Sequence, residues 1–272
     1  MPLRVYLIAY SGARSRTHFI IPPHLLSISS TQLVQSRVTL RLKLHRITGG
    51  NLDQDAIKIS GNLGAATLMI AVIDKTPVSF DEFIDWYPEN SQSQYELRRG
   101  VIIEMPKPRG KHSRLAGDLA FTLGTVIRQA NQPYFIPKEC VVKIASDTGY
   151  EPDIIVLDET AIANESRWER ESIITKSQSI KLVVEVVSTN WRDDYLVKLA
   201  DYEEFGIQEY WIADYLGIGG RRYIGSPKQP TFTVCSLVDG EYEIQQFRGS
   251  DSVISLIFPE FPLTVDEIFN PG

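Results

Sequence analysis

The strongest constraint on the fold is one apolar stretch, Lys181–Ser188, which contains a single acidic residue. Its aliphatic residues occupy both alternating faces of an extended chain: Leu182, Val183, Val184, Val186 and Val187. A strand that is apolar on both faces is covered on both sides, so the stretch predicts a central strand of a sheet. Glu185 would then be buried, and it needs a basic side chain, a metal cation or a proton beside it. A structural ion pair and a metal ligand are the two interpretations.

The composition is typical of a globular protein with a sizeable core: 272 residues, 43% hydrophobic and 23% charged. Cys140 and Cys235 lie far apart, which indicates neither a disulfide scaffold nor a zinc site and favours a reducing cytoplasm. No apolar run approaches the roughly 20 residues of a membrane span, so we expect no membrane association. The net charge of −6 argues against non-specific coating of nucleic acid, although a local basic patch remains compatible with it.

Residues 1–68 differ from the rest of the chain in charge. They carry eight basic and two acidic residues, a net charge of +6, which leaves −12 for residues 69–272. A signal peptide is a weak interpretation because no cleavage site is clear, and a basic nucleic-acid-binding arm is a second one. We favour an extension upstream of a true start at Met69. We therefore expect residues 1–68 to be disordered or poorly packed and to carry no chemistry.

From Met69 onward, helical and strand patterns alternate and predict one mixed α/β domain with a sheet at its centre. The helical period predicts helices over residues 79–86, 111–130, 193–205 and 265–269. A hairpin that turns at Gly100 is expected over residues 95–105. Further strands are expected over residues 134–144, 154–157, 181–188, 209–214, 232–237 and 242–247.

Two acidic residues lie on two of these predicted strands. Pro152 fixes the entry to strand 154–157 and so places Asp153 at its start, while Glu185 lies on the central strand. If the two strands are neighbours, the carboxylates can share one Mg²⁺ or Mn²⁺, because hard cations prefer oxygen ligands.

A basic residue for this site has to come from outside the central strand. The next position on the face of Glu185 is Val187, whereas the following helix offers Lys198. Lys198 shares one predicted helix face with Asp194 and Tyr202. It could orient or activate a water molecule or stabilise negative charge on a phosphate. The alternative is an exposed lysine that merely pairs with Asp194.

These residues together resemble the Uma2 family, a branch of the PD-(D/E)XK nuclease superfamily. The matching pieces are Pro152-Asp153, residues 182–188, Lys198, Tyr202, Gly206 and residues 209–211. The resemblance also includes residues 95–97, the Gly100 turn and His112, and it covers the chain from about Met69 to its end. It implies a restriction-endonuclease-like core and a metal-dependent endonuclease acting on DNA.

The resemblance also implies roles for single residues. Asp153 and Glu185 would bind the metal, with the backbone carbonyl of Val186 as a further ligand. Lys198 would be the superfamily lysine moved from strand to helix, since position 187 holds valine where that lysine is expected. Glu96 would be an additional acid near the metal, although it could instead pair with Arg98 or Arg99. His112 would be a site residue, although a lone histidine near a helix start is more often a surface or capping residue.

A basic cluster precedes and enters the predicted helix 111–130. Six basic residues fall within 17 positions that contain one acid: Arg98, Arg99, Lys107, Arg109, Lys111 and Arg114. Because backbone N–H groups at a helix N-terminus favour phosphate, the cluster predicts contacts with DNA. A solvated charged loop is the alternative.

Three hypotheses follow for the whole chain. The first is a metal-dependent DNA endonuclease, for which a homodimer is expected because both strands must be cut. The second is a catalytically silent nucleic-acid-binding or protein-interaction module that keeps the nuclease fold. The third is a metal phosphoesterase that acts on a small nucleotide.

Overall fold

A computed structural model describes residues 77–88, 93–105 and 107–271, together with the backbone of five strands in the preceding segment. These strands are β1 (Arg4–Ser11), β2 (Ser15–Ile21), β3 (Ser27–Ile28), β4 (Leu42–Lys43) and β5 (Met69–Asp74). The chain divides into two compact units, residues 1–77 and 78–272. In the first unit, β2, β1 and β5 form an antiparallel sheet, and β3 pairs with β4.

The boundary between the units lies eight residues or so beyond Met69, because β5 pairs with β1 of the first unit. Most of residues 1–68 lie outside the described residues. The expectations of disorder, of an upstream extension and of a basic arm therefore stay predictions.

The second unit contains two sheets, and the smaller one has five strands in the order β12-β9-β10-β6-β7. Its strands are β6 (Gln94–Arg98), β7 (Val101–Met105), β9 (Val141–Ala145), β10 (Thr148–Tyr150) and β12 (Ile173–Ile174). The expected hairpin is confirmed: β6 and β7 join at Arg99 and Gly100, both with positive φ (47° and 74°), as a tight hairpin turn requires. Helix α1 (Phe80–Trp86) starts at a Ser79–Glu82 capping box and buries Phe80 and Phe83 against this sheet.

A six-stranded sheet in the order β16-β15-β14-β13-β11-β8 forms the centre of the unit. The strands are β8 (Tyr134–Phe135), β11 (Ile154–Asp158), β13 (Ile180–Val186), β14 (Glu209–Asp214), β15 (Thr231–Val238) and β16 (Glu241–Phe247). Strand β13 runs antiparallel to β11 on one side and parallel to β14 on the other. The predicted central strand and the predicted neighbourhood of the two acid-bearing strands are thus confirmed.

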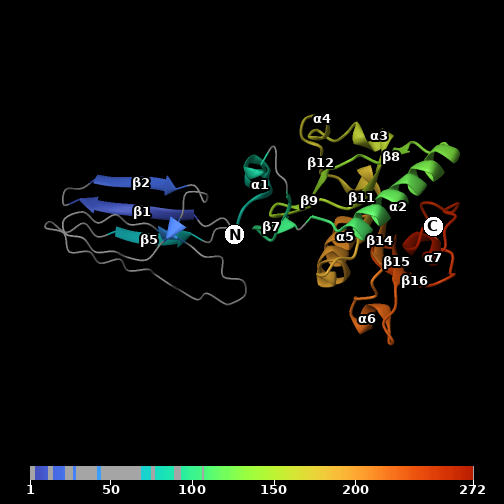
Figure 1. The fold of residues 1–272 in the computed structure, drawn as a ribbon. Coiled ribbons are helices and arrows are strands. Elements are labelled where there is room, and N and C mark those ends of the chain that lie inside the picture. Colours follow the sequence, from blue (N-terminus) through green and yellow to red (C-terminus); the bar gives the residue numbers. More distant parts are fainter. Residues whose placement is uncertain are drawn as a thin grey trace. The chain divides into compact units, whose positions relative to one another are not determined.

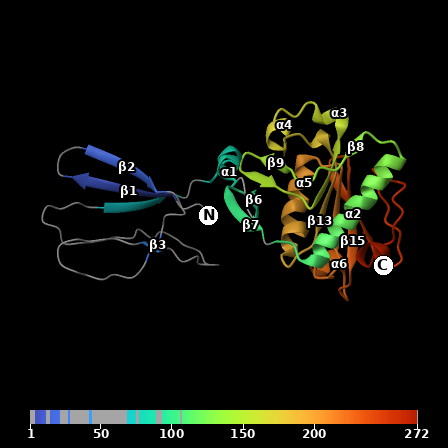
Figure 2. The ribbon, with the colours of Figure 1, turned by 45° about the horizontal axis from the view of Figure 1, so that its top comes forward.

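Helices cover both faces of this sheet (Figures 1 and 2). On one face, α2 (Gly110–Gln129) and the short α7 (Val265–Phe269) pack against Val184 and Val186. On the other face, the π-helix η3 (Asp193–Lys198) and α5 (Leu199–Phe205) cover Val183 and Val187. Because side chains alternate along a strand, Glu185 shares the face of Val183 and Val187 and points toward α5. The mixed α/β fold that we expected is confirmed.

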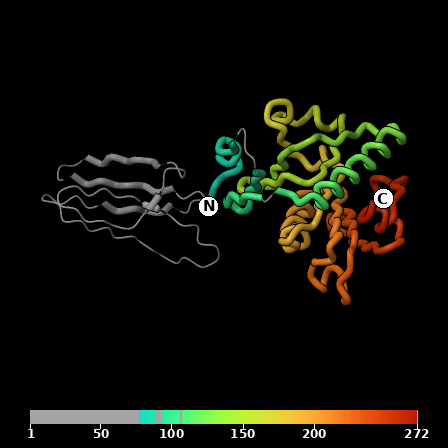
Figure 3. Tube along the Cα trace, in the orientation of Figure 1, coloured from blue at the N-terminus to red at the C-terminus, as the bar shows by residue number. Residues whose placement is uncertain are grey.

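The remaining elements are short, and Figure 3 traces the chain through them toward the C-terminus. They are α3 (Glu159–Ile162), α4 (Trp168–Glu171), the 3₁₀ turn η2 (Ser177–Ser179) and α6 (Arg221–Ile224). The single strand expected over residues 134–144 is wrong. Pro137, which lacks a backbone N–H, lies in the break, and β8 and β9 belong to different sheets. In the part of the chain that the structure describes, no helix is long and apolar enough to cross a membrane.

Candidate active site

Glu185 lies on β13 with only 4% of its surface exposed, and two side chains from the covering helices contact it. Lys198 Nζ donates to Glu185 Oε1 over 2.8 Å, and the Tyr202 hydroxyl donates to the same oxygen over 2.9 Å. Burial raises the pKa of Glu185, and the Lys198 ammonium offsets part of that rise. The expectation that Glu185 is buried with a cation beside it is confirmed.

Lys198 connects the two sheets. Its ammonium is 2.7 Å from Glu96 Oε1 on β6 as well as 2.8 Å from Glu185, and the residue is 3% exposed. Burial by itself would lower the pKa of Lys198, but the carboxylates of Glu185 and Glu96 raise it well above the ordinary value. Lys198 is therefore a permanent ammonium ion at neutral pH and not an exposed partner of Asp194.

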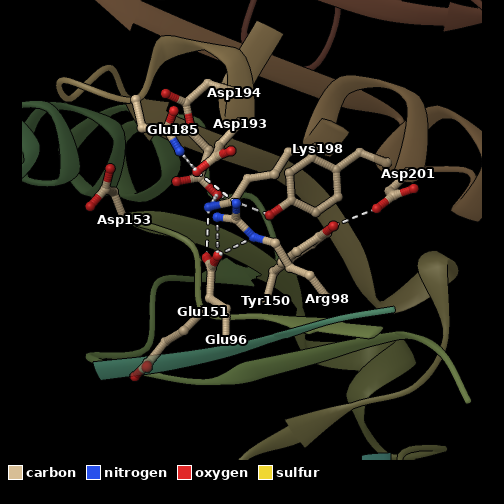
Figure 4. A network of polar contacts seen from close by, with 12 residues as sticks. Glu96, Arg98, Tyr150, Glu151, Asp153, Glu185, Asp193, Asp194, Lys198 and Asp201 are labelled. Atoms are coloured by element: carbon tan, nitrogen blue, oxygen red, sulfur yellow. Dashed lines mark hydrogen bonds and ion pairs between the residues drawn. The ribbon is translucent and has the colours of Figure 1, made fainter. Parts of the chain in front are cut away.

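Asp153 precedes β11 and stands opposite Glu185, since the antiparallel register pairs Ile154 with Val184. Asp153 Oδ2 accepts the backbone N–H of Val186 over 2.8 Å, and the Asp153 side chain remains 26% exposed. In Figure 4 Asp153 lies at the edge of the polar network, apart from the ion pairs of Glu96. The site therefore offers one partly open carboxylate beside one buried carboxylate.

His112, in the first turn of α2, holds the backbone at this point. Its Nε2 is 2.9 Å from the Val186 carbonyl oxygen and 3.4 Å from Asp153 Oδ2. Both neighbouring oxygens are acceptors, so Nε2 carries the hydrogen and donates a hydrogen bond to the Val186 carbonyl oxygen. Burial alone would lower the pKa of His112, but Asp153 raises it above the ordinary value through a hydrogen bond and through its charge. The buried Nδ1 has no hydrogen-bond partner among the described residues.

Acidic groups outnumber basic ones in this cluster. Five carboxylates and two permanent cations gather here: Glu96, Asp153, Glu185, Asp193 and Asp194 against Arg98 and Lys198 (Figure 4). Asp194 is buried, and this burial raises its pKa well above the ordinary value. Even a protonated His112 leaves the cluster short of positive charge. Three of the five carboxylates are buried, Glu96, Glu185 and Asp194, and a surplus of acid at such a site favours binding of protons or of a further cation.

The donors present suit an ion that keeps much of its water. Across the described ranges, no three His, Cys, Asp or Glu side chains are grouped closely enough to hold a metal ion. Mg²⁺ is commonly bound by one or two carboxylates, with water and substrate phosphate completing the coordination. Asp153 and Glu185 fit that mode of binding, whereas they do not fit a closed cage made of protein ligands.

Comparison with known proteins identifies the family. The family model Uma2, described as "Putative restriction endonuclease", matches residues 80–266. The chain belongs to the Uma2 family. A crystal structure from Anabaena variabilis ATCC 29413, described as "a putative nuclease belonging to DUF820", resembles this Uma2 protein with a TM-score of 0.52 and 21% sequence identity. The match covers 71% of this chain and 98% of the other, and it supports a shared nuclease-like fold. No curated protein matches the chain.

The six basic residues that the sequence singled out take different positions in this Uma2 protein. Arg98 is 11% exposed and pairs with Glu96 and Asp193, while Arg99 is 66% exposed and pairs with Asp201 over 2.5 Å. The other four lie on the surface at or before the start of α2: Lys107, Arg109, Lys111 and Arg114. DNA binding by the six residues stays a prediction. The structure holds Arg98, Arg99 and Arg114 in ion pairs, Arg114 with Asp118 over 3.3 Å, and Arg98 is the one of the six that is largely buried.

The N-terminus of α2 in this Uma2 protein lacks the usual neutralising groups. Its N-cap residue, Arg109, makes no side-chain capping hydrogen bond, and its first turn holds no acidic residue. The positive end of the helix dipole is therefore open to an anion, beside three exposed cations. One of these, Lys111, extends its ammonium over the Tyr215 ring, 5.2 Å from the centroid.

Sequence reasoning did not assign site roles to several residues of this Uma2 protein. Tyr202 bonds directly to Glu185, and its shared helix face with Lys198 was the signal that could have shown this. Asp193 forms an ion pair with Arg98, which lies on an element far away in sequence, so the spacing of residues could not indicate this contact. The same holds for Tyr150, whose hydroxyl donates to the Asp201 carboxylate.

Proposed function

We propose that this Uma2 protein is a metal-dependent endonuclease that hydrolyses phosphodiester bonds of DNA. The observation that carries the proposal is the surplus of carboxylates around one buried lysine, at the start of α2 where the surface is basic. A surplus of buried acid attracts a divalent cation, and an exposed basic surface attracts a phosphate backbone. Family membership and fold support the nuclease class, while the metal and DNA are our own extension.

Asp153 and Glu185 would hold Mg²⁺ or Mn²⁺, because they stand opposite each other on neighbouring strands. The Val186 carbonyl would be a further ligand, using the lone pair that His112 does not occupy. When bound, such an ion supplies a Lewis acid for the phosphoryl oxygens and lowers the pKa of a coordinated water molecule.

The protein's own residues have separate tasks in this proposal. Lys198 keeps its proton at neutral pH, so it would stabilise negative charge on the phosphate and would not act as a general base. Tyr202 fixes the orientation of Glu185 through the hydrogen bond to Oε1. His112 donates a hydrogen bond to the Val186 carbonyl and lies beside Asp153. It would therefore fix the position of the backbone next to Glu185.

The exposed cations at the start of α2 would position DNA by its phosphates. Lys107, Arg109 and Lys111 are exposed, and the helix N-terminus between them adds backbone donors. One chain offers one such site, so cutting both strands would need two copies, and we extend the proposal to a homodimer on DNA.

The test is cleavage of plasmid and oligonucleotide DNA by the purified protein, with Mg²⁺ or Mn²⁺ and with EDTA. We expect metal-dependent cleavage that Asp153→Asn lowers by about a hundredfold or more, as is typical when one group stabilising the transition state is removed. Asp239→Asn, in the exposed turn between β15 and β16, is the matched control and should cleave as the unchanged protein does. Equal cleavage by Asp153→Asn and the unchanged protein would contradict the proposal.

A catalytically silent nucleic-acid-binding module is a second candidate, and one observation favours it. Glu96 and Glu185 already have cationic partners without any metal, because Lys198 contacts both and Arg98 contacts Glu96. Binding of DNA in EDTA, with no cleavage of any DNA or RNA in Mn²⁺, would support this module and would reject the endonuclease. Cleavage of nucleotides but not of polymers would reject both.

A further inference from the structure

The Arg98 guanidinium lies between two acidic side chains from different parts of the fold. On one side, its Nη2 and Nε contact Glu96 Oε2 at 2.6 and 3.2 Å. On the other side, its Nη1 lies 2.6 Å from Asp193 Oδ2 at the start of the π-helix. The Arg98 side chain is only 11% exposed, and that of Asp193 is 18% exposed. The guanidinium is therefore a fixed part of the site rather than a mobile surface charge.

Glu96 contacts two cationic centres, one through each of its oxygens. Oε1 lies 2.7 Å from Lys198 Nζ, and Oε2 lies 2.6 Å from Arg98 Nη2 (Figure 4). A carboxylate that joins two cations in this way is the bridging arrangement of sites that hold two divalent ions. In this protein, both of the cations that Glu96 joins are side chains.

Without Arg98, the carboxylates of Glu96 and Asp193 would face each other in a largely enclosed space. Two like charges at such a site either bind a proton or attract another cation. An arginine cannot lose its proton in a protein, so its neutralising charge is permanent. The two acids are thereby unavailable to a metal ion while Arg98 is in place.

We infer that Arg98 takes the place of a second divalent cation and restricts the site to one ion, held by Asp153 and Glu185. This inference rests on the proposed metal-dependent function. It makes Arg98 a positioning residue, because it acts on Glu96 and Asp193 and not on the substrate. It also assigns Asp193, which has no other role in the proposal, to the site that a second ion would occupy.

The test counts bound Mn²⁺ per chain by equilibrium dialysis or by the electron paramagnetic resonance signal of free Mn²⁺. We expect one ion in the unchanged full-length protein and two in Arg98→Met, which exposes both acids to solvent ions. Arg98→Lys keeps the charge and should bind one ion. Arg98→Met combined with Asp193→Asn should also return to one, because the second ion then loses a ligand.

Arg99→Met is the matched control. It breaks the ion pair between the neighbouring Arg99 and Asp201, and the number of bound Mn²⁺ ions per chain should stay at one. If Arg98→Met does not fold, Arg98→Gln keeps a hydrogen-bond donor for Glu96 while removing the charge, and the same second ion is expected.

Two ions in the unchanged protein, or one in folded Arg98→Met or Arg98→Gln, would overturn the inference while leaving the one-metal nuclease intact. No bound ion in the unchanged protein would overturn both the inference and the metal-dependent function on which it rests.

Discussion

Glu151 couples the stability of this protein to pH. It lies two positions before Asp153 (Figure 4), lines a groove next to the candidate site, and accepts a hydrogen bond of 3.0 Å from the Tyr87 hydroxyl. Burial raises its pKa from 4.5 to about 7, and the negative charge of Glu139 adds to the rise. Between these two values the native chain keeps a proton that the unfolded chain has released. The contribution of Glu151 to stability therefore falls as pH rises from about 4.5 to about 7 and stays lower above that range.

At pH 8 in EDTA, Glu151→Gln should therefore raise the free energy of unfolding, by at most about 3.5 kcal/mol at roughly 1.4 kcal/mol per pKa unit. At pH 4.5 the same substitution should change it little, because the native carboxyl is then already neutral. Urea midpoints at the two pH values measure both effects. Glu241→Gln, at an exposed carboxylate at the start of β16, is the control and should shift neither midpoint. An equal effect of Glu151→Gln at both pH values would contradict the assigned titration.

Single residues could be predicted where strand alternation decides their position. Glu185 lies inside an apolar run, so its burial followed from the sequence, and so did its need for a cation. Lys198 and Glu96 were expected near it, and the structure brings all three together. The contact of Arg98 with DNA stays a prediction, while its ion pair with Asp193 was not foreseen, because Asp193 is 95 positions away and no local pattern indicates such a contact.

At the scale of elements, the N-terminus of α2 allows a quantitative prediction about DNA binding. Each phosphate that a cation neutralises contributes about 0.9 to the slope of log K against log salt concentration for duplex DNA. Replacing Lys107, Arg109 and Lys111 together by alanine should weaken binding and reduce that slope by up to about 2.7. Fluorescence anisotropy with a labelled duplex at several salt concentrations measures both quantities.

Arg128→Ala provides the control, because Arg128 is exposed in the last turn of the same helix. It should leave the slope unchanged, since the C-terminal end of a helix repels phosphate. An unchanged slope in the triple variant would show that DNA does not contact this end of α2.

Long, strongly periodic elements could be predicted, while short or irregular ones could not. Helix α2 and the hairpins β6–β7 and β15–β16 follow the expected patterns, because burial repeats over many residues or a tight turn fixes the pairing. The helix over residues 193–205 was expected, but its first six residues form a π-helix. The π-helix carries Asp193 and Lys198 of the candidate site, and no local sequence pattern indicates such an irregularity.

At the scale of the molecule, the sequence indicates one α/β domain behind a basic segment, and the structure places the boundary after residue 77. Composition shows the change in charge near Met69. The pairing of β5 with β1 depends on contacts distant in sequence, which no local pattern indicates, so the domain start at Met69 stays a prediction. Every residue assigned to the candidate site lies in the second unit.

A chain truncated to residues 78–272 should therefore fold and keep the metal binding and DNA cleavage that we propose for the whole protein. Its new end preserves two backbone hydrogen bonds that attach the start of the unit, from Val78 to Gly100 (3.0 Å) and from Phe80 to Ser146 (2.7 Å). Circular dichroism, urea unfolding and Mn²⁺ binding compare it with the full chain, and we expect coincident unfolding midpoints.

Truncation to residues 88–272 is the control, because it also removes α1. Phe80 and Phe83 are fully buried against Leu97, and fully burying one such side chain stabilises a fold by about 1.5–3 kcal/mol. Loss of both should lower the free energy of unfolding by roughly 3–6 kcal/mol. If the 78–272 chain were destabilised as much as the 88–272 chain, the first unit would be part of the same cooperative fold, and the boundary after residue 77 would not separate two independent units.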